Sequence, residues 1–158
     1  PLGVTFDMAR GRALSEAGVC PPADFVLETS LSLQGGYDAA EALLKLPVRP
    51  TAIFTNDDLA IGALRAIHQR GLRVPDDIAL VGFDDIEYAA HTTPPLTTVA
   101  VPKEEMGRLA VRQAIAQMEQ GDQHVFSTTV VAHTLVIRSS CGTGLPAPPS
   151  HRSGRRKP

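Results

Sequence analysis

Residues 50–85 read PTAIFTNDDLAIGALRAIHQRGLRVPDDIALVGFDD, and they decide the fold of this chain. The apolar runs 51–55 and 78–83 are short enough for strands and apolar enough to be buried on both faces of a sheet. Between them, Asn56 is a good N-terminal cap for a helix with an apolar stripe, and Gly71 is suited to end it. A strand, a helix and a second strand with short connections predict a parallel sheet with a right-handed crossover.

Polar side chains follow both predicted strands at the point where each strand ends. Asn56, Asp57 and Asp58 come after the first strand, and Asp84 and Asp85 close the second. Parallel strands end at the same edge of a sheet, and open α/β sheets bind their ligands at that edge. The sequence therefore predicts that a small molecule is recognised here. We expect Asp57 to be structural, since it lies in the first turn of the helix and complements the helix dipole.

The sequence before this stretch predicts two helices and a strand. We expect a helix over residues 6–17, a strand at 25–27, and a second helix that Ser30 or Ser32 caps and that stops before Pro47. The first helix has no credible strand before it. The sheet is therefore expected to be incomplete at its N-terminus.

Beyond the second predicted strand the alternation of strand and helix is lost. Residues 96–101 are expected to be extended, and Pro102 suits the first position of a helix that runs to Gly121. The buried stripe expected for this helix consists of Met106, Leu109, Ala110, Ala114 and Met118. Residues 127–137 are rich in β-forming side chains and predict a late strand, whereas residues 141–158 are expected to be disordered.

Charge is distributed unevenly along the chain. The sequence has 15 Lys and Arg against 17 Asp and Glu side chains, for a net charge of −2. Four of the basic side chains lie in residues 151–158, which contain no acid, so residues 1–150 hold 11 basic against 17 acidic groups. An acidic body has no electrostatic footprint for a phosphate backbone. The basic tail is expected to be a solvated end, with contact to nucleic acid as the alternative.

Neither membrane insertion nor catalysis is indicated by the sequence. There is no apolar run of membrane-spanning length and no secretory signal at the start. Cys20 and Cys141 have no metal-ligand spacing and are expected to be free thiols of a cytoplasmic protein.

The nucleophile, metal-ligand and phosphate-loop motifs of common enzymes are absent, and the five histidines show no ligand spacing. Asp84 and Asp85 are adjacent on a strand and point to opposite faces, so they are not expected to act together as acid and base. We expect neither a cofactor nor a metal, and no enzymatic activity.

Several segments together resemble one family of proteins. They are PTAIFTNDDLAIGALRAIHQRGLRVPDDIALVGFDD (50–85), PPLTTV (94–99), PKEEMGRLAV (102–111) and Arg138-Ser139-Ser140, with weaker similarity in LSEAG (14–18) and GGYDAAEALL (35–44). In this order and at this spacing, the chain resembles the C-terminal part of the effector-binding domain of lactose-repressor-like (LacI/GalR) transcriptional regulators. The resemblance covers about residues 6–140.

This resemblance implies a periplasmic-binding-protein-like (type I) α/β fold, with a parallel sheet and flanking helices, incomplete at the N-terminus. The boundaries implied are 1–95 for the C-terminal subdomain, 96–126 for a crossover and a helix of the N-terminal subdomain, 127–140 for a return strand, and 141–158 for a disordered basic tail. The helix-turn-helix of the family and most of its first subdomain have no counterpart in this sequence. Binding to an operator is therefore expected only through an N-terminal domain that this chain lacks.

The resemblance also assigns effector-binding positions. Asp84 and Asn56 match positions that hydrogen-bond effector hydroxyls, which suits a carboxylate that accepts two bonds and an amide that donates and accepts. Helix capping is the structural alternative for Asn56, and a turn role is the alternative for Asp84. Phe6 stands where many relatives carry an effector-binding arginine, and Arg10, one helical turn further on, is the candidate to substitute for it. Leu31 stands where some relatives stack an aromatic ring on the ligand.

Finally, the resemblance implies a homodimer whose interface includes Ile61, Ala89, His91 and Thr92. The function expected is the sensing of a sugar-like effector by a cytoplasmic transcriptional regulator. The alternative is a solute-binding protein that serves a sugar transporter, since that class shares the fold. An isolated domain without a sensing role is the third possibility.

Overall fold

The computed structural model describes residues 12–120 and 128–143. Residues 12–16 are helical, so the C-terminal half of the helix expected over residues 6–17 is present, and its beginning lies outside the described residues. The elements that follow are η1 (Ala23–Phe25), α2 (Leu33–Leu44), β1 (Ala52–Phe54), α3 (Asp57–Gln69), β2 (Ala79–Asp84), η2 (Glu87–His91), β3 (Thr97–Ala100), α4 (Lys103–Gln120) and β4 (Thr134–Val136). No helix in the described ranges combines the length and apolarity needed to cross a membrane.

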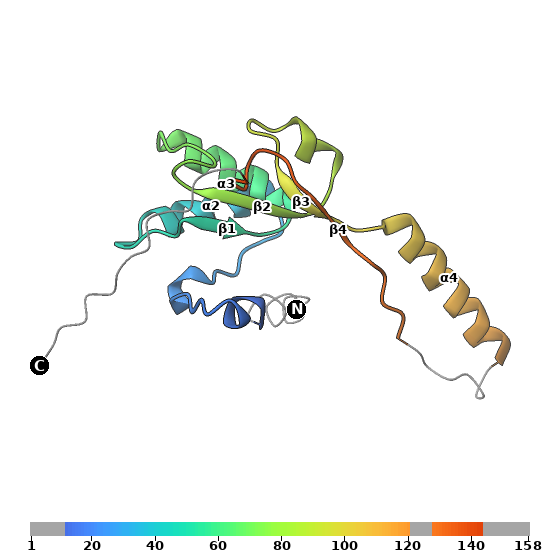
Figure 1. The fold of residues 1–158 in the computed structure, drawn as a ribbon. Helices are drawn as coiled ribbons and strands as arrows, with labels where there is room; N and C mark the ends of the chain where they lie inside the picture. Colours follow the sequence, from blue (N-terminus) through green and yellow to red (C-terminus); the bar gives the residue numbers. More distant parts are fainter. Residues whose placement is uncertain (1–11, 121–127, 144–158) are drawn as a thin grey trace, which may run out of the picture.

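The four strands form one sheet in the order β1-β2-β3-β4 (Figure 1). β1 pairs with β2 and β2 with β3 in parallel, and β4 returns antiparallel to β3. Phe54 lies opposite Val81, and Asp84 lies opposite Ala100. The mostly parallel sheet with flanking helices, expected from the sequence, is confirmed.

Helices α2 and α3 pack against each other and form the helical layer over the sheet (Figure 1). Two glycines let their backbones approach closely. A Cβ atom added at Gly36 would lie 2.1 Å from the Leu59 carbonyl oxygen, and one at Gly62 would lie 2.0 Å from the Leu33 carbonyl oxygen. The core between this layer and the sheet is made of small and branched apolar residues: Ala40, Leu44, Ala60, Ala63, Leu64, Ala66, Ile67, Val74, Ile78, Leu80, Ala89 and Leu96.

The local capping chemistry agrees with the sequence. Ser32, one of the two candidates for the cap of α2, accepts a hydrogen bond from the Gly35 amide at 3.0 Å. Asn56 caps α3 by accepting from the Leu59 amide at 3.1 Å. Both side chains satisfy an amide of the first helical turn that has no partner within the helix. Gly71 has a positive φ of 70° and follows α3, as expected.

Two predicted strands differ in the structure. The strand expected at residues 25–27 is absent, because η1 ends at Phe25 and the exposed residues Val26 and Leu27 have no strand partner in the described part of the chain. The late strand is shorter than expected. Of residues 127–137, only Thr134–Val136 pair with β3, and residue 127 lies outside the described residues.

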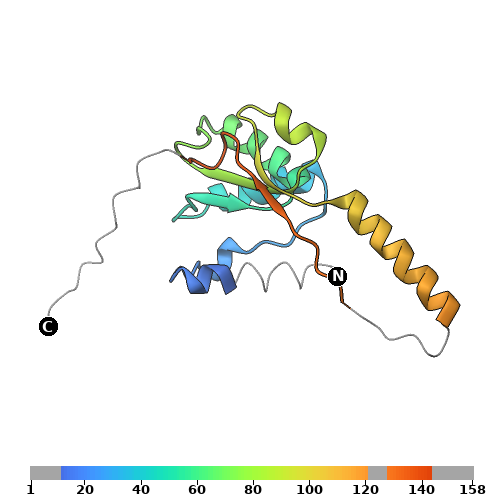
Figure 2. The ribbon, with the colours of Figure 1, turned by 45° about the vertical axis from the view of Figure 1, so that its right-hand side comes forward.

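The stripe expected to be buried on α4 is largely exposed. Met106 is 44% and Met118 is 84% exposed, Ala110 and Ala114 are exposed, and Leu109 alone is half-buried. The physical reason is visible in Figures 1 and 2, where α4 projects away from the sheet and from the α2–α3 layer. The prediction of burial was therefore wrong for the described residues, although the helix itself is present.

Candidate functional site

The carboxyl ends of β1 and β2 bring the predicted site residues to one edge of the sheet. Asn56 comes two residues after β1, and Asp84 is the last residue of β2. The parallel pairing extends past β1, because the Thr55 amide donates to the Val81 carbonyl oxygen at 3.1 Å. Asn56 and Asp84 therefore flank the same edge, as the sequence predicted.

Asn56 can cap α3 and still face a ligand. Its Oδ1 atom accepts from the Leu59 amide, and the side chain is half-buried. No hydrogen bond from its Nδ2 group is made to a residue that the structure describes. As far as the described residues are concerned, both donor hydrogens of the amide group are available for ligand oxygens.

Asp84 has a strained backbone and a perturbed carboxyl group. Its φ of 114° lies in the region that residues with a Cβ atom rarely adopt. Partial burial raises the pKa of Asp84, the ammonium of Lys103 lowers it, and the carboxylates of Asp57 and Asp58 raise it further. No hydrogen bond to the Asp84 carboxylate comes from the described residues. A carboxylate that is partly withdrawn from water gains from ligand hydroxyls that donate to it.

Two basic residues bind the loop that begins at Asp84 and Asp85, and the sequence did not identify either as part of the site. The Lys103 Nζ group donates to the Asp84 carbonyl oxygen. Arg138 forms an ion pair with Asp85 at 2.7 Å and also donates to the Leu96 carbonyl oxygen at 2.7 Å. Both lie in segments that were quoted for the family resemblance, yet only the folded chain places them against this loop. Because the carboxylate of Asp85 is paired with Arg138, we assign Asp85 a structural role rather than a ligand contact.

Asp57 is structural, as its position in the first helical turn led us to expect. Its side chain is fully buried and accepts from the Thr98 hydroxyl at 2.6 Å and from the Ile86 amide at 2.9 Å. These bonds join the start of α3 to β3 and to the loop after β2. Both carboxylate oxygens are satisfied, so this buried acid needs no ligand.

The remaining effector positions are not brought to this edge by contacts in the structure. Phe6 and Arg10 lie outside the described residues. Leu31 lies in the loop before α2 and is 73% exposed. Whether these three positions face a ligand stays a prediction.

The four predicted dimer-interface residues differ in accessibility. His91 is exposed, and Ile61 and Thr92 are half-buried. Ala89 is fully buried in the core, where the Leu96 amide donates to its carbonyl oxygen at 2.8 Å. Its side chain offers no surface to a partner, contrary to the expectation, because it packs in the hydrophobic core. The interface remains a prediction that now rests on Ile61, His91 and Thr92.

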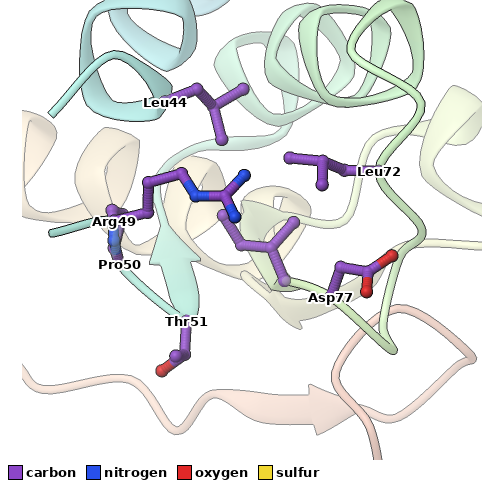
Figure 3. A pocket seen from close by; sticks show the side chains of 7 residues that line it. Leu44, Arg49, Pro50, Thr51, Leu72 and Asp77 are labelled. Atoms are coloured by element: carbon purple, nitrogen blue, oxygen red, sulfur yellow. The ribbon is translucent and has the colours of Figure 1, made fainter. Parts of the chain in front are cut away.

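A pocket of about 250 Å³ lies at the other end of the sheet. It is lined by residues before β1 and β2, by the end of α2 and by the segment after α3: Leu44, Arg49, Pro50, Thr51, Leu72, Asp77 and Ile78. Figure 3 shows the Arg49 guanidinium between Leu44 and Leu72. The pocket is thus separate from the edge that carries Asn56 and Asp84. Among the described residues, no group of three or more potential ligands could hold a metal ion.

Comparison with known proteins identifies the domain. Residues 8–141 match the model of the periplasmic binding protein-like domain. The chain belongs to this family. In open α/β sheets, ligands generally bind at the edge where the carboxyl ends of the parallel strands meet.

The chain is similar in sequence to transcriptional repressors. The chain is 39% identical over 129 residues to the ribose operon repressor of Haemophilus influenzae, an alignment that covers 81% of this chain and 39% of the repressor. The chain therefore spans about two-fifths of the length of this curated relative. The resemblance to lactose-repressor-like regulators is confirmed.

Solved structures agree with this family. The lac repressor dimer bound to operator and the anti-inducer ONPF has a TM-score of 0.74 at 33% identity, covering 83% of this chain and 45% of that one. A LacI family transcriptional regulator from Enterococcus faecalis, solved with bound ribose, has a TM-score of 0.65 at 30% identity, covering 73% of this chain and 42% of that one.

Proposed function

We propose that this chain is the ligand-sensing part of a LacI-type transcriptional regulator and that its effector is a sugar. The observation that carries the proposal is the placement of Asn56 and Asp84 at the carboxyl edge of β1 and β2 in a domain of this family. A half-buried carboxylate and an amide with free donors are suited to the hydroxyl pairs of a sugar ring. The solved relative with bound ribose supports a pentose as the first ligand to test.

The proposed mechanism is linkage between effector binding and a change of conformation. An effector shifts the equilibrium between two states only if it binds one of them more tightly. Lys103, the first residue of α4, contacts the Asp84 carbonyl oxygen, and α4 projects from the sheet. A ligand that engages Asp84 therefore acts beside the point at which α4 leaves the domain.

Dimerisation, operator binding through an N-terminal domain outside this chain, and location in the cytoplasm belong to the same proposal. They rest on the relatives, which are repressors, and on the lac repressor solved as a dimer on its operator. We propose that Ile61, His91 and Thr92 contribute to the interface between two copies. We further propose the boundaries 1–95, 96–126, 127–140 and 141–158 for the two subdomain parts, the return strand and the basic tail.

A sensing role without catalysis is the form of the proposal that the relatives favour. The curated relatives are named as repressors, which supports a regulator over the solute-binding protein of a transporter. We therefore propose no reaction and no cofactor for the edge formed by Asn56 and Asp84.

Isothermal titration calorimetry with a panel of pentoses, hexoses and nucleosides tests the proposal. We expect saturable heat with one member of the panel, beginning with D-ribose. Asp84→Asn is expected to abolish that heat, because the amide accepts fewer hydrogen bonds and carries no charge. Asp38→Asn is the matched control, since Asp38 lies on α2 and its side chain bonds Gln34 at 2.9 Å and no other described residue. Equal binding by wild type and Asp84→Asn would contradict the proposal.

A further inference from the structure

The loop that carries Asp84 is held in an unfavourable backbone conformation. Asp84 and the next residue, Asp85, have φ angles of 114° and 48°, although neither is glycine. Two successive residues in this region persist only when the surrounding structure holds them. The position of the Asp84 carboxylate therefore depends on the buried groups that bond to the backbone of this loop.

A buried polar pair, Asp57 and Thr98, lies at this place and bonds two successive amides of the loop. Both side chains are fully buried. The Asp85 amide donates to the Thr98 hydroxyl oxygen at 3.4 Å, and that hydroxyl donates to Asp57 Oδ1 at 2.6 Å. The Ile86 amide donates to Asp57 Oδ2 at 2.9 Å. The two side chains thus connect α3 and β3 to the residues directly after Asp84.

The backbone of β2 closes the space around this pair. A Cβ atom at Gly82 would lie 1.9 Å from Asp57 Oδ1, so only glycine admits the carboxylate at this depth. A side-chain carbon of Leu96 lies 2.9 Å from the same hypothetical Cβ atom, so Leu96 also packs closely against Gly82. Asp57 Oδ1 therefore lies close against the backbone of β2 at Gly82.

We infer that Asp57 and Thr98 are a positioning pair for the effector contact of Asp84. They act through the Asp85 and Ile86 amides and hold the strained loop so that the Asp84 carboxylate stays at the edge beside Asn56. This inference rests on the proposed function for the identity of the ligand. The loop geometry itself can be tested without any ligand.

Amide hydrogen exchange measured by NMR on the full chain tests the inference. Thr98→Val keeps the side-chain shape but removes the hydroxyl, which leaves the Asp85 amide without its acceptor. We expect Asp85 and Ile86 to exchange about tenfold faster or more, relative to core amides such as that of Ile67. Thr98→Ser keeps the hydroxyl and is expected to restore slow exchange. If Thr98→Val does not fold, Thr98→Ala removes the hydroxyl without placing a methyl group against the carboxylate.

A matched control separates positioning from general stability. Ser140→Ala removes another buried hydroxyl, which donates to the Leu80 carbonyl oxygen at 2.6 Å and accepts from the Thr97 amide at 2.8 Å. This variant is expected to lower protection throughout the sheet but to leave Asp85 and Ile86 unchanged relative to the core. The inference is overturned if the hydroxyl-free Thr98 variants keep the wild-type ratio, or if Ser140→Ala changes that ratio equally.

Titration with D-ribose tells failure of the inference apart from failure of the proposed function. If wild type binds D-ribose, Thr98→Val is expected to bind it about tenfold more weakly, and Thr98→Ser to within about twofold. Unchanged affinity in Thr98→Val overturns the inference. If the wild type gives no heat with any sugar in the panel, the proposed function fails, and the exchange ratios still decide whether the pair holds the loop.

Discussion

At the scale of single residues, Glu41 and Arg70 join α2 to α3 through two hydrogen bonds of 2.7 and 2.8 Å. The Arg70 guanidinium lowers the pKa of Glu41 to about 2, with a smaller contribution from Lys45. A lowered pKa means that the folded chain favours the ionised form. The stabilisation is therefore complete above the ordinary value of 4.5 and is lost as the pH falls towards about 2.

Arg70→Gln is expected to return the pKa of Glu41 towards 4.5 and to remove this part of the acid dependence. NMR titration of the Glu41 side-chain carboxyl carbon measures the pKa directly. Lys45→Met is the control and is expected to raise the pKa much less, because the ammonium lies 3.5 Å from the carboxylate and contributes less than the guanidinium. Equal shifts of the Glu41 pKa in the two variants would contradict the statement that Arg70 is the main cause of the lowered pKa.

For Asp84, the contribution to stability is expected to change with pH in the opposite direction to that of Glu41. Burial raises its pKa, so ionisation of Asp84 destabilises the fold as the pH rises above the ordinary aspartate range. Asp84→Asn is therefore expected to be at least as stable as the wild type at neutral pH, and the difference should vanish in acid. Urea unfolding at the two pH values measures this. Lys103→Met, which removes the cation that lowers the pKa, is expected to raise the pKa of Asp84 further. A destabilised Asp84→Asn at neutral pH would show that the carboxylate is needed by the fold.

At the scale of the elements, Asn56 has a capping role that can be separated from ligand contact. Asn56→Ala removes the bond to the Leu59 amide and is expected to lower the free energy of unfolding by about 1 kcal/mol. Asn56→Ser keeps a capping oxygen but removes the Nδ2 donors. It is expected to remain close to the wild type in stability while binding sugar more weakly. Chemical denaturation and calorimetry on the same samples check both statements. If Asn56→Ser binds sugar with wild-type affinity, Asn56 caps the helix but does not contact the ligand.

The contact between α2 and α3 is expected to tolerate no side chain at Gly62. Gly62→Ala places a methyl group against the Leu33 carbonyl oxygen, and such overpacking typically costs about 1–3 kcal/mol or more. Gly107→Ala on α4 is the matched control, because nothing lies within 4 Å of its added Cβ atom. That change is expected to stabilise the helix slightly, since alanine is the better helix former. Thermal unfolding of the two variants measures the contrast, and equal melting temperatures would contradict the close packing.

At the scale of the whole molecule, local signals in the sequence were sufficient for β1, β2 and β3, for the helix caps, and for the edge that Asn56 and Asp84 flank. They were not sufficient for the strand predicted at 25–27, which is absent, or for the length of β4. Contacts between distant residues were not predictable in this way. Lys103 reaches Asp84 across 19 positions, and Arg138 reaches Asp85 across 53, and neither separation leaves a periodic pattern. The prediction that the apolar stripe on α4 is buried was wrong for a related reason. Periodicity indicates which face of a helix is apolar, whereas burial depends on a neighbour that packs against it.

The central claim is that a sugar binds at the carboxyl edge of β1 and β2. NMR titration of the isotope-labelled chain with D-ribose tests it most directly, because each amide reports its own position. The claim predicts saturable shifts at Asn56, Asp84 and Asp85 and none around Arg49, in the pocket at the other end of the sheet. The claim is contradicted if the shifts gather around Arg49, or if D-ribose and the other sugars leave the amides of Asn56 and Asp84 unchanged.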